Sequence, residues 1–97
     1  MCGAPKQGGA LAGIDLSTQT VIQGQVWHDG APVAGAYVRL LDGTDEFTAE
    51  VVTSPEGEFR FFAAPGTWKV RSLSSVGKGE RVLDAEVGLN ETTIVLD

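Results

Sequence analysis

Cys2 has the most distinctive chemistry in this chain, because it is the only cysteine. If the initiator methionine is removed, as is usual before a small residue, the Cys2 thiol lies beside an α-ammonium group, and Lys6 follows four residues later. Nearby positive charge favours the thiolate, the nucleophilic form of a thiol whose ordinary pKa is about 8.5. The other interpretation is a chain terminus without a chemical role, since termini are usually poorly ordered.

His28 is the only histidine and stands beside Asp29 at a predicted strand-to-turn junction. A dyad with Cys2 is conceivable, because a nucleophile and its base need only meet in space. A turn histidine with local hydrogen bonds fits the sequence better. One histidine and one cysteine do not make a zinc cluster, and no serine lies in the setting of a nucleophile elbow.

An acidic group, Asp42, Asp45 and Glu46, lies in one predicted loop. Carboxylates are calcium ligands, but the loop lacks the full calcium-binding pattern. A solvated turn is the better interpretation. The sequence therefore predicts no metal and no cofactor, and it favours a protein that is not a conventional enzyme.

The elements that must position these residues are strands. From Thr20 onward apolar and polar residues alternate, and turn residues interrupt the pattern about every ten positions, which is typical of an all-β sandwich or barrel. Residues 1–19 are rich in glycine and predict an extended N-terminal arm that carries Cys2, and residues 20–97 predict the sandwich domain. The expected strands are Thr20–Trp27, Ala36–Asp42, Phe47–Thr53, Glu58–Ala63, Thr67–Leu73, Arg81–Val87 and Thr92–Leu96, with Ser74–Glu80 as a loop. Seven short strands with one apolar face each are expected to pack as a seven-stranded antiparallel β-sandwich.

The bulk composition excludes several classes of function. The chain has 97 residues, enough for one domain. Its net charge is −6 and its basic residues are scattered singly, so nucleic acid and anionic membranes are unsuitable partners. No signal peptide is evident, and no apolar run approaches the roughly 20 residues that span a bilayer. We therefore expect a cytoplasmic protein.

Three segments carry a resemblance to a known superfamily. They are GAPVAGAYVRL at 30–40, TSPEGEFRF at 53–61 and PGTWKV at 65–70. This string is similar to the transthyretin-like, carboxypeptidase-regulatory-like β-sandwiches, with Trp68 where that family usually has tyrosine. The resemblance covers roughly residues 20–97 and implies a fold, but no function, because such sandwiches serve as spacers, stabilising modules and binding domains.

A narrower resemblance covers nearly the whole chain. MCGAPKQG at 1–8, FTAEVV at 47–52 and FRFFAAPG at 59–66 resemble a small actinobacterial family of unknown function, described as SseC-like. Its members are typically encoded beside rhodanese-type thiosulfate sulfurtransferases. The resemblance implies a link to sulfur metabolism by association, and a Cys2 thiolate could then accept a persulfide sulfur from such an enzyme.

The outward-facing side of the predicted strands suggests an interface. Alternation predicts that six apolar residues face the core: Ile22, Val26, Val38, Leu40, Phe59 and Phe61. Four large side chains then face outward: Trp27, Tyr37, Leu41 and Phe62. Exposed apolar residues that merge into one patch often mark a protein interface. The alternative is that the arm covers this face through Leu11, Ile14 and Leu16.

Two functions remain after this reasoning. The first is a non-catalytic accessory or protein-binding module whose partner is a rhodanese-type sulfurtransferase, with a homo-oligomer also open. The second is a sulfur carrier or sulfurtransferase component that uses Cys2 as persulfide acceptor. A carbohydrate-binding sandwich using Trp27 and Trp68 is weaker, because Trp68 falls at a core position.

Overall fold

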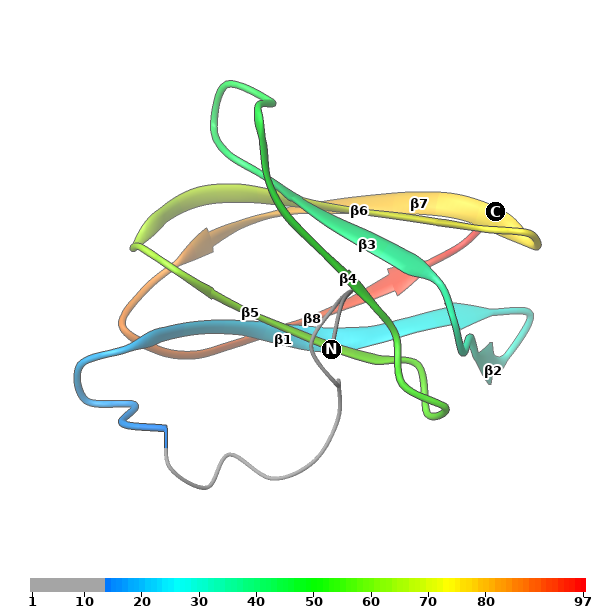
Figure 1. The fold of residues 1–97 in the computed structure, drawn as a ribbon, viewed down its shortest axis with the longest axis horizontal. Helices are drawn as coiled ribbons and strands as arrows, with labels where there is room; N and C mark the ends of the chain where they lie inside the picture. The colour runs from blue at the N-terminus through cyan, green and yellow to red at the C-terminus, as the bar shows by residue number, and fades with distance from the viewer. Residues whose placement is uncertain (1–13) are drawn as a thin grey trace, which may run out of the picture.

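The computed structural model describes residues 14–97, which form two packed β-sheets (Figure 1). The eight strands are β1 (Thr20–His28), β2 (Ala31–Pro32), β3 (Tyr37–Leu41), β4 (Phe47–Val52), β5 (Glu58–Ala63), β6 (Gly66–Ser74), β7 (Gly77–Ala85) and β8 (Gly88–Val95). The all-β sandwich is confirmed, and the two-residue β2 is the strand that the sequence pattern did not predict.

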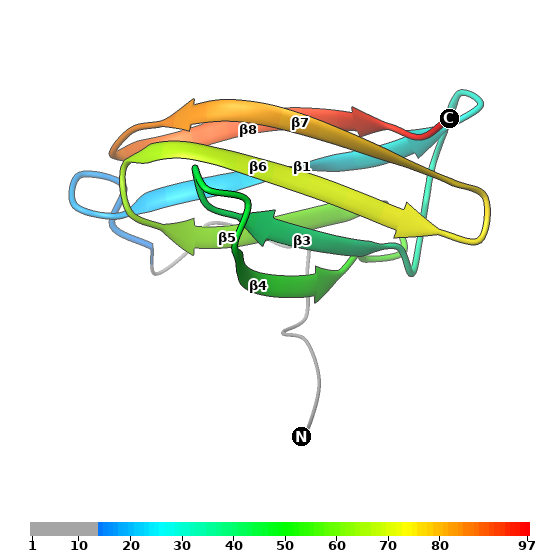
Figure 2. The ribbon, with the colours of Figure 1, turned by 90° about the horizontal axis from the view of Figure 1, so that it is seen from above.

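Each sheet has four strands, and Figure 2 shows them from above. In sheet A, β1 lies between β5 and β8, and the short β2 pairs with the end of β1. Sheet B has the order β4-β3-β6-β7 and is antiparallel throughout. Sheet A contains one parallel pair, β1 with β8, because the chain enters β8 from the neighbouring sheet rather than through a hairpin with β1.

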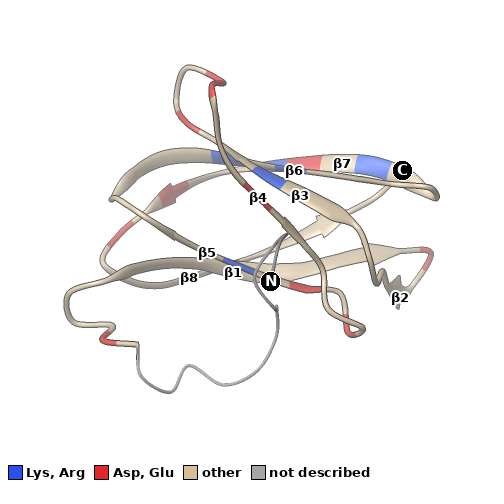
Figure 3. Cartoon of the chain, in the orientation of Figure 1, with Lys and Arg blue, Asp and Glu red and all other residues tan. Residues whose placement is uncertain are grey.

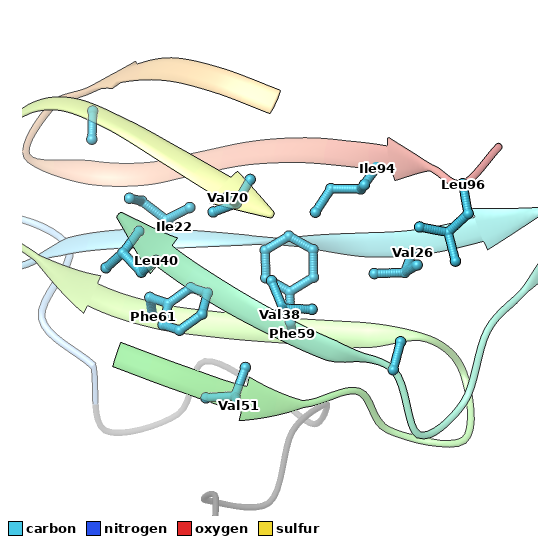
Figure 4. Close-up of a cluster of buried hydrophobic side chains, with 12 residues drawn as sticks. Ile22, Val26, Val38, Leu40, Val51, Phe59, Phe61, Val70, Ile94 and Leu96 are labelled. Atoms are coloured by element: carbon cyan, nitrogen blue, oxygen red, sulfur yellow. The ribbon is translucent and has the colours of Figure 1, made fainter. Parts of the chain in front are cut away.

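Alternate residues of both sheets fill the space between them. The core consists of Ile22, Val26, Ala36, Val38, Leu40, Val51, Phe59, Phe61, Val70, Ala85, Ile94 and Leu96, most of which are labelled in Figure 4. The rings of Phe59 and Phe61 meet with centroids 6.0 Å apart, and Trp68 packs half-buried against the cluster. The predicted inward side is therefore confirmed for six residues: Ile22, Val26, Val38, Leu40, Phe59 and Phe61.

Gly24 marks a close approach of backbones, as its place inside a strand predicts. A Cβ atom on Gly24 would lie 1.8 Å from the carbonyl oxygen of Thr92 and 3.1 Å from Cζ of Phe59. Glycine at this position lets β1 lie against β8 and the Phe59 ring at once.

The region from Ser74 to Glu80 is not the loop that its glycines suggest. Strands β6 and β7 continue as a long hairpin in which Ser74 pairs with Gly77. A Cβ atom on Gly79 would lie 2.6 Å from the carbonyl oxygen of Val95. Because glycine has no side chain, the end of β8 can lie close to the backbone of β7. The predicted strand Arg81–Val87 is too long at its end, because β7 ends at Ala85 and Val87 is exposed.

The threonine of the TSPEG segment organises a turn. The Thr53 hydroxyl accepts a hydrogen bond from the Ala36 amide (2.9 Å) and donates one to the Val33 carbonyl (2.7 Å). The Ser54 hydroxyl accepts hydrogen bonds from the amides of Glu56 and Glu58. This motif thus serves the fold, because its polar atoms are used within the domain.

Candidate interaction surface

The candidate contact residues divide between the two sheets. Tyr37 lies on β3 of sheet B, whereas Trp27 lies on β1 and Phe62 on β5, both in sheet A. Cys2, Lys6 and Leu11 lie outside the described residues. The predicted outward side chains therefore do not form one patch.

Leu41 is a correction to the predicted surface. It is only 4% exposed, although it does not belong to the core cluster. Its neighbours in register are Phe47 of β4 and Lys69 of β6, because β3 is an inner strand of sheet B. Both neighbours are larger than leucine and flank it, so they cover the Leu41 side chain. Leu41 is therefore not available to a partner.

The outer face of sheet A has apolar ends and a polar middle. Phe62 is 57% exposed and stands opposite Val21, which is fully buried. In the middle, the Gln23 side chain accepts a hydrogen bond from Arg60 Nε (3.1 Å). At the other end the half-buried Trp27 donates its indole N–H to Oε1 of Gln25 (3.3 Å). The polar middle separates Phe62 from Trp27, so the two do not share an apolar patch.

The outer face of sheet B has a different order. One row across the strands pairs Val52 with Tyr37 and Tyr37 with Leu73. Tyr37 is 53% exposed and Leu73 is 59% exposed, so two large apolar side chains stand side by side in solvent. Phe47 and Val82, from the edge strands of this sheet, are also more than half exposed. We call the surface formed by Tyr37, Arg39, Phe47, Glu50, Arg71, Leu73, Glu80 and Val82 the outer face of sheet B.

A charged row crosses this face next to the Tyr37–Leu73 pair. In register its order is Glu50, Arg39, Arg71 and Glu80, one residue from each strand. Figure 3 shows the basic residues on β3, β6 and β7. Arg39 Nε lies 2.7 Å from Glu50 Oε2, and Arg71 Nε lies 3.6 Å from Glu80 Oε1. Both arginines are thus balanced by a glutamate on the side away from the other arginine.

Two further contacts hold the charged side chains. The Arg39 guanidinium lies 5.8 Å from the centre of the Phe47 ring, within the range of a cation–π interaction. Lys69 Nζ lies 2.8 Å from Asp45 Oδ1, and the hydrogen bond to Asp45 raises the pKa of Lys69 above its ordinary value. A cleft of about 340 Å³ is lined by residues of both rows: Tyr37, Arg39, Glu50, Arg71 and Leu73.

The remaining candidates have structural partners. His28 Nδ1 lies 3.3 Å from the carbonyl oxygen of Leu96, a hydrogen bond that joins the ends of β1 and β8 rather than a local one. Asp42 closes its loop by accepting hydrogen bonds from the Thr44 amide and hydroxyl and from the Glu46 amide. These bonds, the Thr44 hydroxyl first, lower the pKa of Asp42. Within residues 14–97 no group of three metal-binding side chains is brought together.

Three exposed residues on the outer face of sheet B were not among the candidates: Phe47, Leu73 and Val82. Leu73 lies on the same side of β6 as Lys69 and Arg71, and Val82 lies on the opposite side of β7 from Leu83. Strand alternation could therefore have placed both outward. Phe47 carried no such signal, because a bulge between Leu40 and Leu41 shifts the register of β4 next to it.

Comparison with known proteins places this chain in a family. Residues 2–96 match the model of a family of proteins of unknown function, DUF1416. The chain belongs to the DUF1416 family. Two relatives in Mycobacterium tuberculosis, the uncharacterized proteins Rv0814c and Rv3118, are each 54% identical over 97 residues and match over 97% of both chains. An uncharacterized protein of Mycolicibacterium smegmatis is 58% identical over 85 residues, covering 86% of this chain and 94% of its own.

A solved structure supports the fold of this DUF1416 member. The crystal structure of a DUF3823 family protein from Parabacteroides merdae superposes with a TM-score of 0.66 at 11% identity. The match covers 81% of this chain and 46% of that protein, so the chain spans less than half of its length. Among residues 14–97 there is no helix long and apolar enough to cross a membrane.

Proposed function

We propose that this DUF1416 protein is a non-catalytic, protein-binding β-sandwich module that docks its partner on the outer face of sheet B. The observation that carries the proposal is the exposed Tyr37–Leu73 pair beside the charged row of Arg39 and Arg71. Aromatic residues and arginine are enriched in protein interfaces, and apolar centres with charged surroundings are typical of them.

The other sheet is less suited to docking. Its apolar residues are divided between its two ends, with Phe62 and Leu89 at one end and Trp27 and Val95 at the other. Hydrogen-bonded polar side chains lie between the two ends. On sheet B, Tyr37 and Leu73 are direct cross-strand partners, so their apolar areas merge. A contiguous apolar area is more informative about binding than isolated exposed residues.

For the partner we propose a rhodanese-type sulfurtransferase, in the cytoplasm. The support is the resemblance to the SseC-like family, whose members are typically encoded beside such enzymes. A docking module needs no catalytic group of its own, which agrees with the structural roles of His28 and Asp42.

The experiment is calorimetric titration of the full chain with a rhodanese-type sulfurtransferase. The double variant Tyr37→Ser/Leu73→Ser should weaken binding by about 2 kcal/mol or more in total, because it removes the aromatic and the aliphatic side chain at the centre of the proposed face. Phe62→Ser is the matched control, since it removes a similarly exposed aromatic from the other sheet. Equal loss in the control and the double variant would contradict the proposed face, and no binding by the unaltered chain would contradict the proposed partner.

The second candidate function uses Cys2 as a persulfide acceptor. It is favoured by the position of the single cysteine within the segment that matches the family, residues 2–96. In this reaction the Cys2 thiolate attacks the outer sulfur of the enzyme persulfide, the sulfur–sulfur bond of the enzyme breaks, and the enzyme thiolate leaves. The outer face of sheet B would then hold the donor enzyme.

Intact mass spectrometry distinguishes the two functions. The protein is incubated with thiosulfate and a rhodanese, and its mass is compared with that of Cys2→Ser. A gain of one sulfur atom in the unaltered chain alone would establish the carrier. No gain, with Cys2 still alkylatable, would leave the docking module.

A further inference from the structure

The centre of the outer face of sheet B contains an unfavourable pairing. Arg39 of β3 and Arg71 of β6 stand directly opposite each other. Like charges at opposed positions destabilise a sheet, because their Cβ atoms are only about 4.5–5.5 Å apart. Each arginine has a glutamate on its far side, Glu50 and Glu80, and these ion pairs reduce the repulsion between the two arginines.

The two arginines can still serve another acceptor. The hydrogen bond from Arg39 to Glu50 uses Nε, and the closest approach of Arg71 to Glu80 also involves Nε. A guanidinium carries five N–H donors in a planar fork, so its terminal nitrogens can bind a second anion. Phe47 beneath Arg39 fixes that side chain, which favours binding because less conformational freedom remains to be lost.

Apolar walls adjoin these donors. Tyr37 and Leu73 form the next row of the face, and they line the same cleft as Arg39, Glu50 and Arg71. An occupant of this cleft meets two arginines on one side, one of them paired with Glu50, and an aromatic and an aliphatic side chain on the other. A free inorganic anion would contact only the arginine side of the cleft and leave Tyr37 and Leu73 without a partner.

We infer that the cleft receives a partner segment in which an acidic side chain lies next to an apolar residue. The carboxylate binds between Arg39 and Arg71, and the apolar neighbour packs on Tyr37 and Leu73. This inference rests on the proposed function and names the chemistry that its docking face recognises. Because this chain has a net charge of −6, the partner is acidic at this contact and not over its whole surface.

A second copy of this chain is a poorer occupant. A two-fold axis through the centre of the face would place Arg39 and Arg71 against the same residues of the other copy. Like-charge contacts across an interface disfavour association. A carboxylate from a different protein removes the repulsion that a second copy would increase.

The test is an NMR titration of the ¹⁵N-labelled full chain with two capped tripeptides. One contains leucine, aspartate and phenylalanine, and the other has asparagine in place of aspartate. The aspartate peptide should shift the amide signals of Tyr37 and Leu73 and bind about threefold to fivefold more tightly, since an exposed ion pair contributes up to about 1 kcal/mol. Arg71→Gln should abolish this difference, and Arg60→Gln, the same change on sheet A, should retain it.

Three results would overturn the inference: equal affinity for the two peptides, shifts confined to sheet A, or no shift up to the solubility limit of the aspartate peptide. Slower diffusion of the chain at rising concentration, with shifts on this face, would instead identify a second copy as the occupant.

Calorimetry with the sulfurtransferase separates this inference from the proposed function. If Tyr37→Ser/Leu73→Ser abolishes binding while Arg71→Gln leaves it unchanged, the acidic contact is wrong and the docking face stands. If neither variant changes the affinity, the docking face itself is wrong.

Discussion

Replacing Thr53 by valine is expected to destabilise the domain well beyond the effect of a surface change. Valine has nearly the shape of threonine but no hydroxyl, so the Ala36 amide and the Val33 carbonyl lose their partner. Ala36 is fully buried, and water cannot easily replace the lost bond. Leaving the buried Ala36 amide without a partner costs about 1–3 kcal/mol. The Val33 carbonyl is only part-buried and can bind water instead, so the whole loss should be about 1–3 kcal/mol.

This loss is large for a domain of this size. A chain of 97 residues is expected to have a free energy of unfolding of roughly 5–15 kcal/mol. Each kilocalorie lost lowers the melting temperature by about 4–8 °C, so Thr53→Val should melt roughly 4–24 °C below the unaltered protein.

Urea unfolding followed by tryptophan fluorescence measures the effect, with Thr53→Ser as the control. Serine keeps the hydroxyl and loses one methyl group, so it should cost about 1 kcal/mol or less. A valine variant as stable as the serine variant would refute the reasoning, because the hydroxyl would then contribute nothing to the turn.

Three further predictions follow from contacts in the domain. Gly24→Ala should destabilise the domain by about 1–3 kcal/mol or more in urea unfolding, because its methyl group would overlap the Thr92 carbonyl. Gly43→Ala should be tolerated, because the nearest atom to its methyl group would be the Thr67 carbonyl oxygen at 3.8 Å. Phe59→Ala should cost about 3–5 kcal/mol and Val82→Ala about 0.5 kcal/mol or less, because Phe59 is buried and Val82 is 62% exposed. Similar losses in the two variants would contradict the inward and outward assignment of these residues. The pKa of Asp42 is lower in the folded chain than its ordinary value of 3.8. The ionised Asp42 therefore stabilises the folded chain above that value, and this stabilisation is lost as the pH falls through the lower folded pKa. The urea midpoint of Asp42→Asn should consequently fall less between about pH 5 and about pH 2 than the midpoint of the unaltered chain.

Much of the fold could be predicted from local pattern. Alternation in β1, β3, β5 and β6 identifies the inward residues, and the Ser-Pro-Glu-Gly segment marks a turn. The hairpin between β6 and β7 could not be predicted, because Gly77 and Gly79 resemble strand breakers in sequence. Their function is to admit the backbone of Val95 and Asp97, which lie far along the chain.

The candidate site was harder to predict because it depends on strand order. Alternation shows on which side of a strand Tyr37 or Trp27 lies, but not that β3 and β1 belong to different sheets. Alternation also says nothing about Leu41, which is buried by neighbours on β4 and β6. The Arg39–Arg71 pair arises only when β3 pairs with β6, two strands that are not consecutive in the chain.

The most direct test of the proposed docking face is an NMR titration of the unaltered, ¹⁵N-labelled chain with an unlabelled rhodanese-type sulfurtransferase. The amide signals of four residues should shift or broaden first: Tyr37, Arg39, Arg71 and Leu73. Changes centred on Trp27, Gln23 and Phe62, on the outer face of sheet A, would contradict it.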